Sequence, residues 1–248
     1  MAKFTVSNSA LNAFFGGCAH RYPLFKQYST KDAIMPPPMK FGIAVHKAID
    51  VGIPDKTTPA VRMAAERLLN LADKNGYQIL ATEVKHFAPL TDDINVFGLI
   101  DVLALTADGK PVIIDWKTGG YPWETTELET GELVTMKAVG WQGAIYTMPP
   151  FEMPVEWDEW PREVHYLVVP TNGNAAIHKY YANEEDLSNL VQAATIIKEA
   201  DDRGWYPKNI GYECRDCLFM HACWKTPNWE RYYDTRKGTQ ADANEPEV

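Results

Sequence analysis

The sequence has no long hydrophobic run. Hydrophobic residues make up 46% of its 248 residues and charged residues 23%, which is the composition of an ordinary globular protein. No apolar stretch approaches the length of about 20 residues that a helix needs to cross a bilayer. Residues 10–20 contain Cys18 and could be mistaken for the end of a lipoprotein signal, but Asn12 interrupts their short apolar core. We therefore expect a cytoplasmic protein with no membrane segment.

Positive charge is scarce. Lysine and arginine together number 24 against 33 acidic residues, which gives a net charge of −9 at pH 7. A chain with this charge does not attract nucleic acid through its overall field. Any contact with nucleic acid must therefore come from bound metal or from local basic residues such as Arg21, Lys26 and Arg231.

Cysteine is rare, and its four copies are not scattered. They are Cys18, Cys214, Cys217 and Cys223, so that three of them form a C-x2-C-x5-C group. Stable disulfides are uncommon in a reducing cytoplasm, so clustered cysteines indicate metal binding or catalysis. Zinc commonly uses two C-x2-C pairs. One pair, one offset cysteine and one remote cysteine suit a [4Fe–4S] cluster at least as well, and the spacing leaves both open.

The sequence also lacks a glycine-rich loop ending in Lys-Ser or Lys-Thr, which excludes a P-loop motor. Its hydrophobic periodicity and turn residues predict alternating helices and strands, which together form an α/β core with a mixed sheet and helices on its faces. The helices are expected at residues 7–17, 41–50, 57–76, 134–148 and 184–204, and the strands at 77–89, 94–105, 110–118, 162–170 and 175–183. Residues 34–40, IMPPPMK, are predicted to be a stiff linker outside any helix.

Two aspartates stand inside or at the end of apolar runs. Asp101 lies in GLIDVLAL and Asp115 ends VIID, where an unpaired carboxylate is costly to bury. The two runs are joined by an Asp-Gly turn centred near residue 108, and each aspartate lies seven residues from that centre. A hairpin with this turn would place the two carboxylates directly opposite each other.

Opposed carboxylates repel each other unless a cation lies between them, and hard oxygen ligands favour Mg²⁺ or Mn²⁺. Strand alternation places Lys117 on the same face as Asp115, with Trp116 on the other. The ammonium group could then orient a water and offset charge on a phosphate. Asp-x-Lys alone is more typical of a structural ion pair, but the spacing around the turn favours a site.

The segment GLIDVLALTADGKPVIIDWKTGG resembles the core motif of the PD-(D/E)XK nucleases, in particular their RecB-type branch. FGIAVHKAID resembles that family's upstream helix, whose histidine binds metal, here His46. WQGAIY matches its Gln-x-x-x-Tyr helix, here Gln142 and Tyr146, and SNSALNAFFGGCAHRYPL resembles its opening, with Cys18-Ala19 in place of the usual Cys-Pro. The resemblance spans residues 7 to 224.

This resemblance implies a restriction-endonuclease-like core with a metal-dependent active site. Asp101, Asp115 and Lys117 would be catalytic, and the metal would be held by His46, Asp101, Asp115 and the carbonyl of Trp116. Gln142 and Tyr146 would bind substrate. Glu83, on the preceding strand, could reach the site or face solvent. For His46, Gln142 and Tyr146 taken singly, an ordinary structural role would be the better interpretation, but their joint occurrence in the family's order favours a functional role for all three.

The resemblance also implies an iron–sulfur centre. AddB-type nucleases and small CRISPR-associated adaptation nucleases carry one N-terminal and three C-terminal cysteines around a [4Fe–4S] cluster. In this chain Cys18 would join Cys214, Cys217 and Cys223, which would tie the N-terminal and C-terminal segments together. We expect one nuclease domain at residues 1–235, with its core at about 77–200, and a disordered tail at 236–248.

We therefore expect a metal-dependent DNA exonuclease that acts on single-stranded DNA or DNA ends, with Mg²⁺ or Mn²⁺ and a structural [4Fe–4S] cluster as cofactors. The alternative is a non-catalytic DNA-end-binding or adaptor subunit of a recombination or CRISPR adaptation complex. A helicase or a recombination protein would be the partner in either case. The sequence gives neither the cleavage polarity nor the oligomeric state.

Overall fold

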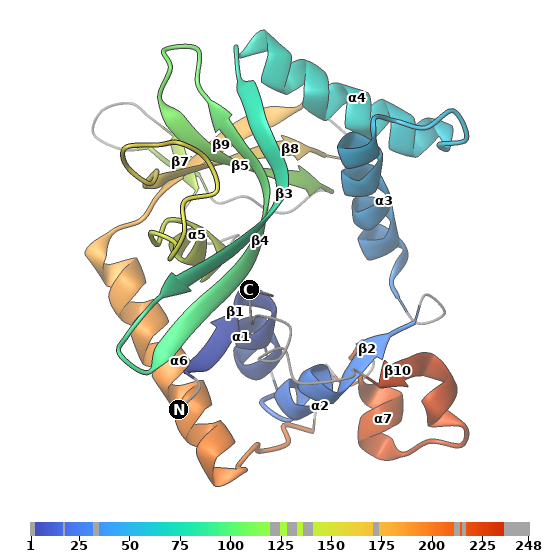
Figure 1. The fold of residues 1–248 in the computed structure, drawn as a ribbon. Helices are drawn as coiled ribbons and strands as arrows, with labels where there is room; N and C mark the ends of the chain where they lie inside the picture. The colour runs from blue at the N-terminus through green and yellow to red at the C-terminus, as the bar shows by residue number, and fades with distance from the viewer. Residues whose placement is uncertain are drawn as a thin grey trace.

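The fold is built around a mixed sheet. The structure, a computed structural model, describes residues 3–16, 18–31, 35–119, 125–127, 133–135, 141–170, 174–210, 214 and 217–235. The strands are β1 (Phe4–Ser7), β3 (Gln78–Pro89), β4 (Ile94–Leu105), β5 (Pro111–Thr118), β6 (Thr125–Glu127), β7 (Leu133–Thr135), β8 (Glu163–Val169) and β9 (Ala176–Tyr181). They run in the order β1-β4-β5-β8-β9-β7-β6, and β3 also pairs with β4 (Figure 1). Parallel and antiparallel pairs both occur, which confirms the predicted mixed sheet.

Strand β4 has more than two partners. It pairs along most of its length with β3, while β1 pairs with residues 94–97 and β5 with residues 102–105. Between β1 and β5, residues 98–101 of β4 have no strand partner on that side within the described part of the chain. The sheet therefore has a local opening in the middle of its longest hairpin.

Helices cover both faces of the sheet (Figure 1). On one face, α3 (Pro37–Val51) and α4 (Pro59–Lys74) pack on side chains such as Val102, Ile114 and Trp116. On the other, α1 (Asn8–Phe15), α5 (Trp141–Tyr146) and α6 (Glu184–Arg203) pack on a second cluster that contains Ile113 and Tyr166. The α/β architecture with flanking helices is as predicted.

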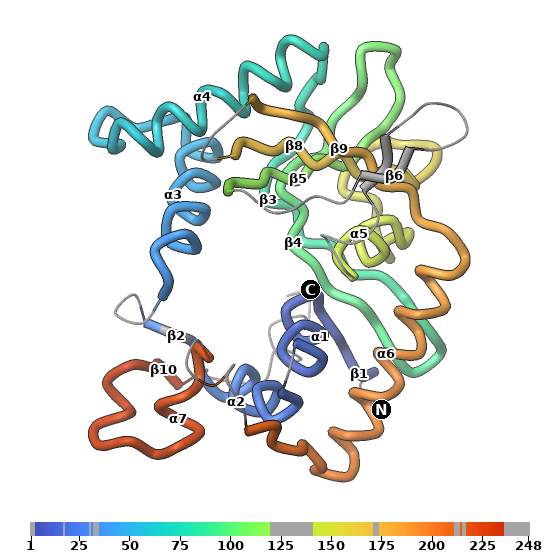
Figure 2. Tube along the Cα trace, turned by 180° about the vertical axis from the view of Figure 1, so that it is seen from behind, coloured from blue at the N-terminus to red at the C-terminus, as the bar shows by residue number. Residues whose placement is uncertain are grey.

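A small unit lies apart from the sheet, beside α2 (Arg21–Gln27), in both views (Figures 1 and 2). It contains β2 (Tyr28–Thr30), α7 (Met220–Trp224), a 3-10 turn (Trp229–Tyr232) and β10 (Tyr233–Thr235). β10 pairs antiparallel with β2, and Leu24, Tyr28 and Phe219 share a small core. Residues from the two ends of the described chain are thus joined.

Several helix ends form as their sequences predict. Ser7 is the N-cap of α1 and its side chain accepts a hydrogen bond from Ala10 N, and Asn183 does the same for α6 through Asp186 N. Thr58 is the N-cap residue of α4, but its side chain makes no capping bond. No helix in the described ranges is long and apolar enough to cross a membrane.

The prediction for residues 34–40 is wrong. Pro37 to Lys40 form the first turn of α3, with Pro36 at the N-cap. A proline in the first helical turn loses no hydrogen bond, because the N–H groups there have no intrahelical partner. The proline run therefore begins the helix instead of preceding it.

The helix predicted at residues 134–148 is also too long. Among the described residues of this range, Trp141–Tyr146 is helical, and Thr135 belongs to strand β7 (Leu133–Thr135). Strand β1 is absent from the prediction, since four residues are too few to show a clear alternation. The TNGN turn, the predicted tail at 236–248 and residues 136–140 lie wholly or mainly outside the described residues.

Candidate active site

Two buried carboxylates occupy opposing strand positions beside the opening in the sheet. The β4–β5 register pairs Val102 with Ile114 and Leu103 with Ile113, so that its continuation places Asp101 opposite Asp115. Asp101 is 8% exposed and Asp115 is 1% exposed. The Asp-Gly hairpin therefore has the predicted register.

Asp101 marks the point where β5 leaves β4. Its Oδ2 accepts a hydrogen bond from the backbone N–H of Trp116 at 2.7 Å, which replaces a bond of the strand ladder. Its Oδ1 lies 3.5 Å from Nδ1 of His46, on α3. One carboxylate thus closes the end of the hairpin and faces the helix that covers it.

Asp115 is part of a chain of polar contacts that leads to α5. The ammonium group of Lys117 forms an ion pair with Asp115 Oδ2 and donates to Gln142 Oε1 at 3.0 Å. Gln142 Nε2 in turn donates to Asp115 Oδ1 at 2.9 Å and lies 2.8 Å from the hydroxyl of Tyr146. Gln142 therefore contacts both members of the Asp-x-Lys pair, and Trp116 packs on the opposite face as predicted.

Gly98 leaves the space that lets Tyr146 join these polar contacts. A Cβ at residue 98 would lie 2.6 Å from Cε1 of Tyr146, which is too close for any other residue unless the ring moved. The ring therefore packs directly on the backbone of β4, and its hydroxyl donates to the carbonyl of Leu99. This contact uses the unpaired stretch of β4 and fixes α5 against the site.

Glu83 lies on the other side of Asp101. The β3–β4 register pairs Thr82 with Val102 and Val84 with Ile100, so Glu83 occupies the position opposite Asp101. Its φ is +50°, in the left-handed region that is unfavourable for a residue with a side chain. Sequence reasoning left Glu83 open because neither the strained backbone nor the register can be read from its neighbours in the chain.

His46, Glu83 and Asp101 present ligand atoms that all lie within 4.8 Å of one another. One imidazole nitrogen and two carboxylate oxygens are a donor set that suits Mn²⁺ or Mg²⁺. The arrangement therefore fits a divalent cation, with Asp115 on the neighbouring strand.

The pKa values in this group reflect its burial and its charges. Burial raises the pKa of Asp115, and the nearby Asp101 adds to the shift, although Lys117 opposes it. Burial also raises the pKa of Glu83, as do the charges of Asp101 and Asp50. Burial alone would lower the pKa of His46, but its contact with Asp101 outweighs this, so the pKa is raised. Bound positive charge would relieve the mutual repulsion of the acids.

The group opens on a hollow of about 940 Å³ that is connected to solvent. Its walls include His46, Glu83 and Asp101, together with Ile43, Lys47 and Leu99. The possible ligand atoms of His46, Glu83 and Asp101 are therefore accessible from outside.

Comparison with known proteins agrees with this geometry. A family model described as "PD-(D/E)XK nuclease superfamily" matches residues 52–224, which is more than half of the chain. The chain belongs to the PD-(D/E)XK nuclease superfamily. No curated protein matches it at a significant level.

One of two similar solved structures supports the fold at low identity. The crystal structure of a "Putative exonuclease" from Eubacterium rectale is 11% identical, with a TM-score of 0.53, and the match covers 98% of this chain and 93% of the other. The crystal structure of SSO0001 is 14% identical, covers 90% and 87% of the two chains, and has a TM-score of 0.42. The first match is consistent with the restriction-endonuclease-like fold of this PD-(D/E)XK protein.

Three basic residues that the sequence offered as DNA contacts are engaged elsewhere. Lys26 forms a salt bridge of 2.9 Å with Asp201, and Arg21 donates to the carbonyl of Gly16. Arg231 lies over the ring of Tyr232, with 4.6 Å between its guanidinium carbon and the ring centroid. The charge of Lys26 is therefore paired with an acid of the protein and is not free for a DNA phosphate.

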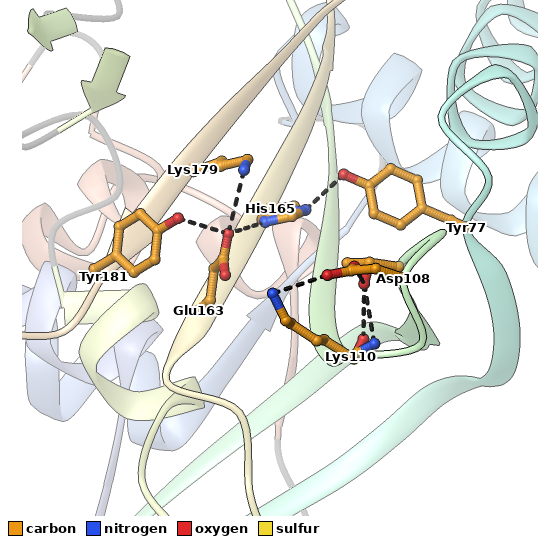
Figure 3. Close-up of polar contacts among 8 residues, drawn as sticks. Tyr77, Asp108, Lys110, Glu163, His165, Lys179 and Tyr181 are labelled. Atoms are coloured by element: carbon orange, nitrogen blue, oxygen red, sulfur yellow. Dashed lines mark hydrogen bonds and ion pairs between the residues drawn. The ribbon is translucent and has the colours of Figure 1, made fainter. Parts of the chain in front are cut away.

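A second polar cluster lies on the opposite face of the sheet from Asp115 (Figure 3). Tyr77 contacts Nδ1 of the buried His165 at 2.6 Å, and Nε2 of His165 contacts Glu163. Tyr181 also donates to Glu163 at 2.9 Å, and the Lys179 ammonium lies 3.7 Å from the same oxygen. Burial and the charge of Glu163 raise the pKa of Tyr77 to about 12, which argues against a nucleophilic phenolate. The cluster joins the starts of β3 and β8 to β9, and nothing in the sequence pattern singles it out.

The four cysteines of this nuclease-family chain line one hollow beside α2 and α7. It has about 360 Å³ of empty volume, part of it open to solvent. Burial raises the pKa of Cys223, and the charges of Cys18, Cys217 and Cys214 add to the shift. The backbone N–H of Asn209 donates to the sulfur of Cys18 at 3.4 Å. Residues almost 200 positions apart thus meet at one place.

Proposed function

We propose that the protein is a metal-dependent DNA exonuclease that hydrolyses phosphodiester bonds of single-stranded DNA or of DNA ends. The observation that carries this proposal is the accessible group of His46, Glu83 and Asp101 beside the Asp115–Lys117 pair. Membership of a nuclease superfamily supports the reaction class, and the fold shared with a "Putative exonuclease" is consistent with it.

Mg²⁺ or Mn²⁺ would be held by His46, Asp101 and Asp115, with the carbonyl of Trp116 and with Glu83 as a further ligand. When bound, the cation would make a coordinated water more acidic and neutralise charge on the phosphate. The carboxylates must be ionised and His46 must be neutral to hold it.

Lys117 would orient the attacking water and donate to a phosphate oxygen. Its amine is set in place by Asp115 and by Gln142, so that it needs little reorganisation when charge develops. Gln142 and Tyr146 would act as positioning residues, since Gln142 contacts Lys117 and Asp115 while Tyr146 anchors Gln142 to the backbone of β4. The family resemblance assigns these two residues to the substrate, and a contact with substrate through Gln142 is compatible with this role.

The cysteines would hold a [4Fe–4S] cluster with a structural role. Tetrahedral zinc at about 2.3 Å from each sulfur would place the sulfurs about 3.8 Å apart. The four cysteines line one hollow, so they could share one metal centre. The family resemblance, with one N-terminal and three C-terminal cysteines, favours a multinuclear cluster over a single zinc ion.

The test is the digestion of end-labelled single-stranded and double-stranded DNA in Mg²⁺ or Mn²⁺ by the wild type, Asp115→Ala and Lys117→Ala. Both variants are expected to lose cleavage, by at least about 100-fold, since each removes a group that would act on the phosphate or the water. Both should keep the visible absorbance of the cluster, because neither Asp115 nor Lys117 lines the hollow of the cysteines. Cleavage that persists in either variant would contradict the assignment of that residue.

DNA binding with no hydrolysis by the wild type in either metal would instead support a non-catalytic end-binding or adaptor subunit. A colourless protein that contains zinc would contradict the iron–sulfur assignment and leave the nuclease proposal intact.

A further inference from the structure

The hollow beside the carboxylates has apolar walls as well as charged ones. Leu99 is 42% exposed and Ile43 is 53% exposed, and both line it. Leu99 is the one exposed residue of β4, whose other residues are buried or half-buried. Large apolar side chains at this place offer a contact surface that neither a metal ion nor a phosphate would use.

Secondary structure places these side chains beside the proposed metal ligands. Leu99 precedes Asp101 by two residues in a strand, and Ile43 precedes His46 by three residues in a helix, so each pair shares a face. An apolar group is thus present on both the α3 side and the β4 side of the metal-binding atoms.

Two lysines continue the same face of α3. Lys40 precedes Ile43 by three residues and Lys47 follows it by four, and Lys47 also lines the hollow. Among the residues that the structure describes, neither lysine has an acidic partner within 4.0 Å. In a chain with a net charge of −9, two such lysines beside the site are suited to bind an anionic backbone. Asp50 follows Lys47 by three residues and also lines the hollow, so the basic surface is limited to the part of α3 before it.

We propose that Ile43 and Leu99 bind an unstacked nucleobase of a single strand, while Lys40 and Lys47 bind its neighbouring phosphates. A base inside a closed duplex is stacked on both faces and offers no apolar surface to these side chains, whereas a flexible strand does. The inference rests on the proposed nuclease function and defines its substrate as a single strand or a frayed end.

The test compares kcat/KM for two end-labelled strands of equal length. One is oligo(dT), and the other is a strand of abasic deoxyribose phosphates, which has the same charge but no bases. The wild type is expected to prefer oligo(dT) about tenfold, the effect of burying one apolar contact. Ile43→Ser and Leu99→Ser should each lower kcat/KM on oligo(dT) by a similar factor, so that the ratio of kcat/KM on oligo(dT) to kcat/KM on the abasic strand falls toward one.

Matched controls are available on other elements. Ile196 on α6 is 43% exposed and Leu80 on β3 is 39% exposed, and neither lines the hollow. Ile196→Ser and Leu80→Ser should cut both strands like the wild type, and thermal unfolding should show that all four variants are folded. Equal losses on both strands, no loss on oligo(dT), or a wild type that shows no preference would overturn the inference and leave the nuclease function standing. A wild type that cuts neither strand would overturn the proposed function itself.

The proposed phosphate contacts of the lysines are tested separately, through the salt dependence of KM. Lys47→Gln should weaken the salt dependence of KM for oligo(dT) by about 0.7 in the slope of log KM against log salt, the value for one phosphate contact on a single strand. Lys74→Gln, an exposed lysine at the end of α4, should leave the slope unchanged. A Lys47→Gln slope equal to that of the wild type would contradict the phosphate contact.

Discussion

The buried acids of the site are costly to ionise in the absence of a cation. Asp115 is 1% exposed, and the ion pair with Lys117 only partly offsets the loss of water. Asp101 on β4 lies between Asp115 on β5 and Glu83 on β3, and its charge disfavours the ionised form of both. The group is therefore arranged for a ligand that carries positive charge.

The first residue-scale prediction concerns pH. Burial raises the pKa of Asp115 to about 6, and the pKa values of Glu83 and His46 are raised as well. Each protonated form excludes the cation, so affinity for Mn²⁺ should be full at pH 8 and fall through pH 6, where ordinary carboxylates would still be ionised. Calorimetric titration of Mn²⁺ between pH 8 and pH 5 measures this, and we expect a loss of about tenfold or more per pH unit below pH 6. An affinity that is constant down to pH 5 would contradict it.

The second residue-scale prediction concerns Gly98. In Gly98→Ala the new methyl group would collide with the ring of Tyr146, displacing Gln142 and through it Lys117. We expect kcat to fall about 10-fold to 100-fold with little change in KM, and the protein to lose about 1–3 kcal/mol of stability. Tyr146→Phe should lower kcat through the same contact, so the double variant should be little worse than Gly98→Ala alone. Fully additive losses would show that the two residues act independently.

At the scale of secondary-structure elements, local patterns were sufficient for the hairpin and for most helices. The Asp-Gly turn sets the register of β4 and β5, and two acids in apolar runs indicate the site, so Asp101 and Asp115 could be placed opposite each other from the sequence. The position of β1 could not be predicted, because its pairing with β4 joins residues 90 positions apart. The contacts of Gln142 and Glu83 depend equally on distant packing and on a strained backbone, which leave no periodic signal.

The element-scale prediction concerns the polar cluster of Tyr77, His165 and Glu163. His165→Leu would leave the Tyr77 hydroxyl without its partner and remove one partner of Glu163, which should cost about 1–3 kcal/mol of stability. Since His165 faces away from Asp115, kcat per folded molecule should remain that of the wild type. Urea unfolding and active-site-normalised rates measure the two effects. A large loss of kcat in a stable variant would instead show that the cluster acts on the site.

At the scale of the whole molecule, the hollow lined by the four cysteines brings together residues from the two ends of the described chain. The small unit of β2, α7 and β10 has a modest core of its own, and α2 connects it to the sheet domain. A centre bound by Cys18 and by Cys214, Cys217 and Cys223 would cross-link the chain over almost 200 residues. In a chain-entropy treatment a link of this length contributes about 5 kcal/mol.

Cys18→Ser should therefore have an effect far larger than the loss of one buried thiol. We expect loss of iron and of the visible absorbance, a markedly lower thermal midpoint, and rapid proteolytic removal of the segment that contains α7, because only the β2–β10 pair and a small core would still hold it. Ser29→Ala, in the same unit but away from the hollow, should retain iron and resist proteolysis. If Cys18→Ser kept the wild-type iron content and stability, the link between the two ends would depend on packing alone, and Cys18 would have no part in the centre.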